Sequence, residues 1–354
     1  MNIKRILPLA FASMLLFNVS CSSDNDVETI ETKVNYTNGI LVSNEGGFTK
    51  PTSDVTFISN NLGTVYNNIY ANNNKGEAFG KVLQTIGFSG DKAYLVANIP
   101  NKIDIVNRTT FKLQTTVTEN LDNPRYIAFS GSKYFVTNNN FSGKKKLNAY
   151  NISDNTYVGS IEFPRLAEKV VEAEGNIIVQ TDGVGYDASF TQELPTGYTI
   201  TVVNPSTMVN PTTITLPAKG IIKDLIAYEG IAYVLVADKV DSYIYEINSK
   251  TGSYTTTTLT SIPNVQKLRA YNNEFYFITD TKKIYEKPIA TGAPIMPLAT
   301  ATGNVYGFDV IDGKIFAAEA NFTTDGKVNV YDALSGTLLK TFTAGVGTNG
   351  FYKN

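Results

Sequence analysis

A tight turn between two strand-like runs recurs along this chain, and the recurrence limits its possible folds more than any other sequence feature. The turns are centred on Gly90, Gly131, Gly175, Gly230, Asn273 and Gly313, 40 to 55 residues apart. A short apolar run follows each turn: Ala93–Val96, Tyr134–Val136, Ile177–Val179, Tyr233–Val236, Phe275–Ile278 and Ile315–Ala318. Self-similarity at such a period predicts one supersecondary unit repeated through most of the chain.

The segment from Asn123 to Phe163 shows the unit most clearly. Four short runs rich in β-branched and aromatic residues follow one another there, as expected for half-buried strands. They are Tyr126–Phe129, Lys133–Thr137, Leu147–Asn151 and Tyr157–Phe163, separated by turn-forming Ser, Gly, Asn and Asp residues. This pattern predicts a four-stranded antiparallel meander.

Six complete units can be counted, but seven second strands and seven third strands are present. The extra second strand, Ile40–Val42, has no first strand before it, whereas Gly347–Tyr352 resembles a first strand with nothing after it. Pairing these two segments would complete a seventh unit and remove the open edges of the array. The sequence therefore predicts an all-β chain folded as a seven-bladed β-propeller, whose first blade is completed by the C-terminal strand. A stacked array of β-sandwiches, which needs no terminal closure, is the alternative.

The repeated motif resembles that of YncE-like propellers. The residues that carry the resemblance are the run Tyr126–Val136 and the turn Tyr331–Gly336, and the likeness extends over about residues 38–354. It implies the propeller fold, with the first strand of each blade lining a central channel. It does not imply an activity, because propellers serve many functions.

The first 37 residues are typical of a targeting signal followed by a flexible tether. Lys4 and Arg5 precede the apolar run Ile6–Phe17, which is too short to span a bilayer, and Asn18–Cys21 resembles a lipoprotein lipobox. We expect a signal peptide over residues 1–20, lipidation of Cys21, a flexible tether over 21–37 and the propeller over 38–354. An ordinary secretory signal with an incidental Cys21 is the alternative.

The acidic run Ser22–Asp26 resembles the surface-export signal of lipoproteins from Bacteroidetes-type bacteria, although a plain solvated linker would look the same. We therefore expect an outer-membrane lipoprotein, exposed at the cell surface and attached to the membrane through its lipid anchor.

The composition argues against several classes of site. The chain has no His and one Cys, so Ser–His and Cys–His nucleophiles and His-ligated metal sites are ruled out. Its formal charge of −2 does not suggest a nucleic-acid partner. No catalytic constellation or phosphate-binding loop is evident, and we expect a protein that is not an enzyme and has neither a cofactor nor a bound metal.

Two polar sets mark the face that carries the long loops. When the units are aligned on their turns, Arg125, Lys169 and Lys267 share one register and Lys223 lies one residue earlier, where the first strand enters the channel. They could bind an anionic ligand, although solvated loop ends would also be basic. A ring of Asn and Asp follows the second strands, at Asn44, Asn98, Asn138, Asp182, Asp238, Asp280 and Asn321. It could surround the channel mouth or only form strand-end turns.

Aromatic residues lie in the long polar loops of the same face: Phe48, Phe141, Tyr186, Phe190 and Phe322. They could form a contact surface or pack locally to fold their own loops.

The N-terminal targeting signal and the expected fold together resemble those of the propeller lipoproteins of Bacteroidetes-type bacteria that capture a scarce nutrient. The resemblance implies a cobalamin or ferric-siderophore ligand that is passed to a TonB-dependent outer-membrane transporter. Two alternatives remain: a non-catalytic interaction subunit of an outer-membrane complex, and a glycan hydrolase or lyase, which would need two carboxylates facing one cleft.

Overall fold

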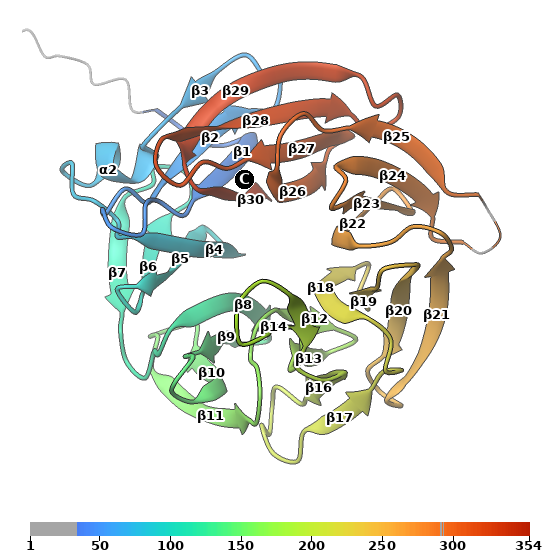
Figure 1. Cartoon of the computed structure of the whole chain (residues 1–354). Coiled ribbons are helices and arrows are strands. Elements are labelled where there is room, and N and C mark those ends of the chain that lie inside the picture. Colours follow the sequence, from blue (N-terminus) through green and yellow to red (C-terminus); the bar gives the residue numbers. More distant parts are fainter. Residues whose placement is uncertain (1–33, 291, 293) are drawn as a thin grey trace, which may run out of the picture. The chain divides into compact units, whose positions relative to one another are not determined.

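Seven four-stranded antiparallel sheets follow one another around a ring in the computed structural model, which describes residues 34–290, 292 and 294–354 (Figure 1). Residues 35–354 form one compact unit. The expected signal peptide, Cys21 and the acidic run after it lie outside the described residues. Within the described part of the chain, no helix is both long and apolar enough to cross a membrane.

The strands of each blade run in sequence order from the channel outward, except in the first blade. That blade consists of β30 (Thr348–Lys353), β1 (Gly39–Asn44), β2 (Asp54–Ser59) and β3 (Val65–Tyr66). The next three are β4 (Val82–Ser89), β5 (Lys92–Ile99), β6 (Lys102–Asn107) and β7 (Leu113–Val117); β8 (Pro124–Ser130), β9 (Lys133–Asn139), β10 (Lys145–Asn151) and β11 (Tyr157–Phe163); and β12 (Val170–Ala173), β13 (Asn176–Gln180), β16 (Thr199–Val203) and β17 (Thr212–Thr215). The last three are β18 (Ile221–Tyr228), β19 (Ile231–Ala237), β20 (Ser242–Asn248) and β21 (Ser253–Leu259); β22 (Val265–Tyr271), β23 (Glu274–Thr279), β24 (Lys283–Pro288) and β25 (Met296–Thr300); and β26 (Val305–Ile311), β27 (Lys314–Glu319), β28 (Asp325–Asp332) and β29 (Leu338–Val346).

The ring closes as the sequence predicts. β30 pairs antiparallel with β1, with Ile40 opposite Lys353 and Val42 opposite Phe351. The Phe351 ring is buried against Phe316 of the last blade, with 5.4 Å between ring centroids. The C-terminal strand is therefore part of the first blade and part of the hydrophobic contact with its neighbour.

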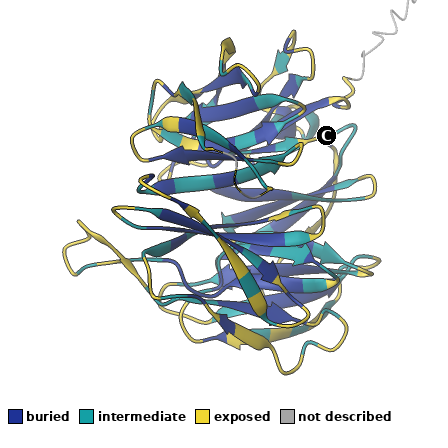
Figure 2. Ribbon diagram, turned by 90° about the vertical axis from the view of Figure 1, so that its right-hand side faces the viewer, coloured by how far each residue is buried: buried dark blue, intermediate teal, exposed yellow. Residues whose placement is uncertain are grey.

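The apolar core lies between the blades rather than inside any one of them. Second strands are buried along nearly their whole length, which explains why they read as continuous apolar runs. Outer strands such as β7 and β11 are largely exposed or alternate in burial. Figure 2 shows buried segments mainly in the strands and exposed ones mainly in the loops.

Two elements were not expected from the sequence. Helix α2 (Ile69–Asn73) packs beside β2, where Asp54 accepts hydrogen bonds from the backbone of Tyr70 (2.8 Å) and Ala71 (3.1 Å). A hairpin of β14 (Val184–Tyr186) and β15 (Glu193–Pro195) occupies the long loop of the fourth blade. Both lie in segments of low strand periodicity, and tertiary contacts rather than local propensity hold them.

The terminal closure predicts a strong dependence of stability on β30. Deleting Gly345–Asn354 removes the innermost strand of the first blade, so we expect loss of cooperative thermal unfolding by circular dichroism. Phe351→Ala should cost about 3–5 kcal/mol because it empties a buried aromatic site. Phe141→Ala is the same change at a side chain that is 90% exposed, and it should stay within about 0.5 kcal/mol. An unchanged melting temperature after the deletion would contradict the closure.

Candidate functional site

A cavity of about 590 Å³ lies at the centre of the ring. Its wall comes from the seven innermost strands, together with Asn139 at the end of the second strand β9, and Glu45 and Tyr186, which lie between the second and third strands of their blades. The cavity is therefore open toward the face that carries the long loops. Its volume falls in the range of about 300–1,000 Å³ that small-molecule sites occupy.

β-Bulges shape the wall of this cavity. The innermost strand of six blades skips one or two residues in its pairing with the second strand, close to the point where the strand begins. The skipped residues are Gln84, Arg125 with Tyr126, Lys223, Gln266, Tyr306 and Asn349. All except Gln266 line the cavity. A bulged residue is free of the ladder and can re-aim its side chain, so the bulges bring polar and aromatic groups to the channel.

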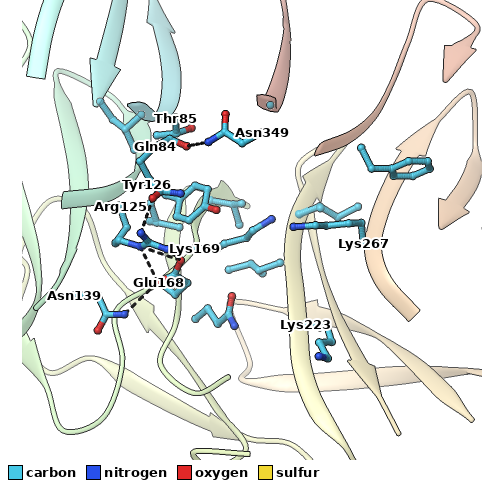
Figure 3. Close-up of a pocket in the computed structure, with 18 of the residues that line it drawn as sticks. Gln84, Thr85, Arg125, Tyr126, Asn139, Glu168, Lys169, Lys223, Lys267 and Asn349 are labelled. Carbon is cyan, nitrogen blue, oxygen red and sulfur yellow. Dashed lines mark hydrogen bonds and ion pairs between the residues drawn. The ribbon is translucent and has the colours of Figure 1, made fainter. Parts of the chain in front are cut away.

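The four basic residues predicted from the repeat register all line the cavity. Arg125 forms an ion pair with Glu168 (2.7 Å) and also contacts Gln84 (Figure 3). Lys169 pairs with the buried Asp224, and Lys223 pairs with Glu193 of the β14–β15 hairpin. The cavity is therefore not a uniformly positive funnel, since acidic residues accompany most of its basic ones.

Lys267 differs from the other three. Within residues 34–290, 292 and 294–354 its ammonium has no hydrogen bond or ion pair, and Figure 3 shows Lys267 and Lys169 extending toward each other. Burial, followed by the nearby positive charge of Lys169, lowers the pKa of Lys267 to about 8.

Sequence reasoning missed several charged residues of this site, including Glu45 and Glu168, although a signal was available for one of them. Asp224 lies six residues before its turn, as Arg125, Lys169 and Lys267 do, but only the basic members of that register were considered. Arg269 and Asp309 lie two residues deeper on their strands, and Arg269 bridges Asp224 and Asp309 at 3.0 Å each. Burial alone would raise the pKa of Asp224, but the charges of Lys169 and Arg269 hold it at about 2.

Polar contacts run around the whole inner ring and link each innermost strand to the next. The steps are Gln84 to Arg125, Arg125 to Glu168, Lys169 to Asp224, Asp224 to Arg269, Arg269 to Asp309, Tyr306 to Glu45, Glu45 to Asn349, and Asn349 to the backbone of Leu83 and Gln84. We call this set the inner polar ring. It fixes the side chains that line the cavity before any ligand arrives.

The Asn residues predicted to surround the mouth do not line the cavity. Asn44 and Asn138 are buried and accept hydrogen bonds from Gly345 (3.0 Å) and Asp122 (2.8 Å), respectively, which ties strand ends together. Asn98 donates to Gln84 at 3.3 Å and so lies one residue behind the wall. The structure thus places these three at strand ends, beside or behind the site.

The loop aromatics divide into two groups. Tyr186 lines the cavity and packs against Phe190 (6.2 Å between centroids), both on the β14–β15 hairpin. Phe322 packs edge-on against the cavity residue Tyr306 (5.2 Å). Phe48 and Phe141 are 76% and 90% exposed, and neither lines the cavity. Tyr186, Phe190 and Phe322 are therefore brought to the rim of the site, whereas Phe48 and Phe141 are not.

We also considered whether the acidic side chains of the cavity could hold a metal ion. Across the described residues, no group of three or more His, Cys, Asp or Glu side chains is arranged to hold a metal ion. Two of the cavity carboxylates, Glu168 and Asp309, are instead paired with Arg125 and Arg269.

Lys267 has no ion-pair partner in the described part of the chain, so its removal is predicted to increase stability. Folding lowers its pKa from about 10.4 to about 8, so the charged ammonium is penalised below pH 8, and the penalty disappears above the unfolded pKa. Lys267→Met should therefore stabilise the chain by about 1 kcal/mol at pH 7 after allowing for cavity water, and by nothing above pH 11. Urea unfolding measures this. Lys250→Met, at an exposed turn, is the control and should stay near zero. A loss of stability in Lys267→Met would contradict the assignment.

Asp224 predicts an opposite dependence on pH. Its folded pKa lies below the unfolded value of about 3.9, so its contribution is complete above pH 4 and is lost as the pH falls through about 2. Asp224→Asn leaves Lys169 without its partner and should cost about 3–5 kcal/mol at pH 7. The difference from the wild type should shrink in acid unfolding measurements below pH 4. A constant difference from pH 7 to pH 2 would count against this ion-pair network.

Solved structures share this architecture at low sequence identity. The β-propeller domain of Cps50 (Swd1) from Myceliophteria thermophila is 10% identical, with 76% of this chain and 89% of that chain covered and a TM-score of 0.57. Dihydro-heme d1 dehydrogenase NirN, solved in complex with DHE, is 14% identical over 91% of this chain and 76% of its own, with a TM-score of 0.56. BamB from Moraxella catarrhalis is 13% identical over 73% and 72%, with a TM-score of 0.50. These similarities show the fold alone.

No curated protein matches the chain. The propeller fold that the resemblance implied is confirmed, and the resemblance to YncE-like lipoproteins stays a prediction. A family match covers residues 38–349, which is nearly the whole propeller. The chain belongs to the family described as Domain of unknown function (DUF5074).

Proposed function

We propose that this chain is a non-enzymatic capture protein that binds a small molecule in its central cavity. The observation that carries the proposal is the cavity of about 590 Å³, into which bulges in the innermost strands direct polar side chains. The inner polar ring holds those groups in place, and a preorganised wall reduces the entropy lost on binding.

The chemistry of the wall supports binding more than catalysis. Two of the cavity carboxylates, Glu168 and Asp309, are paired with Arg125 and Arg269, and these ion pairs fix their orientation. Three further groups, Gln84, Asn139 and Asn349, offer neutral donors and acceptors around the wall. Convergent, mutually satisfied polar groups are typical of sites that recognise a ligand.

A more specific proposal concerns the localisation of the protein and the identity of its ligand. With Cys21 lipidated, the tether would keep the propeller at the outer surface of the outer membrane, above a TonB-dependent transporter. The ligand would be a cobalamin or a ferric siderophore, delivered from the cavity to that transporter. Either molecule exceeds a cavity of this size, so part of it would lie across the rim formed by Tyr186, Phe190 and Phe322.

Exposed aromatic residues favour a second candidate function. Phe48, Phe141 and Phe190 are 72–90% exposed on loops, where water disfavours aromatic surface. An interaction subunit of an outer-membrane complex would bury them against a protein partner, because aromatic residues are enriched at such interfaces.

A thermal-shift screen tests capture. Residues 21–354 with Cys21→Ser are heated with cobalamins, ferric siderophores, haem and simple glycans. A ligand present at a hundred times its dissociation constant should stabilise the native state by about 2.7 kcal/mol. A shift that is weakened by a cavity change, Lys267→Met, and kept in Phe141→Ala supports capture in the cavity. No shift with any compound rejects capture, and a pull-down from outer membranes that depends on Phe48, Phe141 and Phe190 would support the interaction subunit.

A further inference from the structure

Ion pairing around the cavity leaves two opposite charges without partners. Four of its five cations form ion pairs: Arg125 with Glu168, Lys169 and Arg269 with Asp224, Arg269 also with Asp309, and Lys223 with Glu193. Among the described residues that line the cavity, only Lys267 and Glu45 carry a charge that no ion pair offsets. These two residues are therefore the ones that a ligand could pair with without breaking the inner polar ring.

Lys267 is placed to accept an anion. Its ammonium lies beside the Tyr306 ring, 5.9 Å from the centroid, and lines the cavity. Burial first, and then the nearby positive charge of Lys169, disfavours the protonated form of Lys267 and lowers its pKa. A ligand carboxylate at this point would relieve that repulsion and form a charge-assisted hydrogen bond, which is about twice as strong as a neutral one.

Glu45 is placed to accept a cation. Its Oε1 receives hydrogen bonds from Asn349 Nδ2 (2.9 Å) and Tyr306 Oη (3.0 Å), and these fix the orientation of the carboxyl group. In the part of the chain that the structure describes, Oε2 has no hydrogen-bond partner, and the residue lines the cavity. Burial raises the pKa of Glu45, so an arriving cation would stabilise its ionised form.

Tyr306 connects the two charges. Its hydroxyl donates to Glu45, and Lys267 lies over its ring. Phe322 packs edge-on against that ring at 5.2 Å and extends the apolar surface toward the mouth. Glu45, which could bind a cation, the aromatic ring of Tyr306, and Lys267, which could bind a carboxylate, therefore follow one another along one side of the cavity.

We propose that this side of the cavity selects a small zwitterion, with its carboxylate on Lys267, its ammonium on Glu45 and its apolar body against Tyr306. The proposal rests on the capture function proposed above and specifies the class of ligand. A free amino acid or short peptide has this chemistry. A dianion would meet one unpaired cation and the carboxylate of Glu45, and a simple amine would meet the repulsion of Lys267.

Capped peptides test the proposal. Isothermal titration calorimetry on residues 21–354 with Cys21→Ser would use free amino acids, di- and tripeptides, and three matched probes. These probes are glycyl-phenylalanine, its C-terminal amide, which lacks the anion, and its N-acetyl form, which lacks the cation. We expect the zwitterion to bind and each capped form to bind at least about tenfold more weakly.

Two variants assign each half of the ligand to a residue. Lys267→Met should abolish the preference for a free carboxylate and keep the preference for a free ammonium. Glu45→Gln, which retains the oxygen that Asn349 and Tyr306 bind, should do the reverse. Lys250→Met and Glu77→Gln make the same changes at exposed positions and should retain both preferences. This design separates each pairwise contact from general effects on the fold.

The outcomes distinguish this inference from the proposed function. If capped and free peptides bind equally, or if the variants keep both preferences, the zwitterion assignment is wrong. If no zwitterion binds but a cobalamin, siderophore or haem stabilises the protein, the assignment is again wrong while capture stands. If neither screen finds a ligand, both proposals fail.

Discussion

The pairing of β30 with β1 is the constraint on which the rest of the structure depends. It turns a linear array of sheets into a ring, and it also brings Asn349 beside Glu45 and the backbone of Gln84. The backbone of Glu45 donates in turn to the carbonyl of Gly347, just before β30 (2.9 Å). Closure of the fold and assembly of the cavity wall are therefore one event, since the last residues of the chain supply both.

The inner polar ring shows how a propeller can carry many charges at its centre. Burying an isolated charge is costly, but each paired cation contacts a carboxylate that a neighbouring blade supplies. Asp224 contacts both Lys169 and Arg269, so three adjacent blades meet at one carboxyl group. Such pairs contribute more to the position of side chains than to net stability. Lys267 stands out because it has no such pair with any residue that the structure describes.

Sequence reasoning reached the fold because its evidence was local and repeated. Turn residues, strand lengths and the unmatched segments Ile40–Val42 and Gly347–Tyr352 identify the blades and their closure without knowledge of distant contacts. The same register brought Arg125, Lys169 and Lys267 to the site, since equal distance from the turn means equal depth in the channel. The fold was therefore accessible from the sequence, together with the basic part of the site.

The rest depended on geometry that the sequence does not display. A bulge at Lys223 or Gln84 has no adjacent glycine to mark it, and only the register with the next strand reveals it. Pairing of Arg125 with Glu168 joins residues of different blades, so neither position indicates the other. The sequence left the strand-end residue Asn138 open as a ligand group or a turn residue, and only its hydrogen bonds place it at a strand end.

The bulges also bear on how this scaffold can change over evolutionary time. Residues in a ladder are constrained by a partner across the strand and by the neighbouring blade, whereas Gln84, Lys223 and Asn349 lie where the ladder is interrupted. Exchange of a side chain there alters what the channel presents while the backbone pairing of the blade persists. Substitution at a few positions of the innermost strands can thus change the wall of the channel while the architecture is kept.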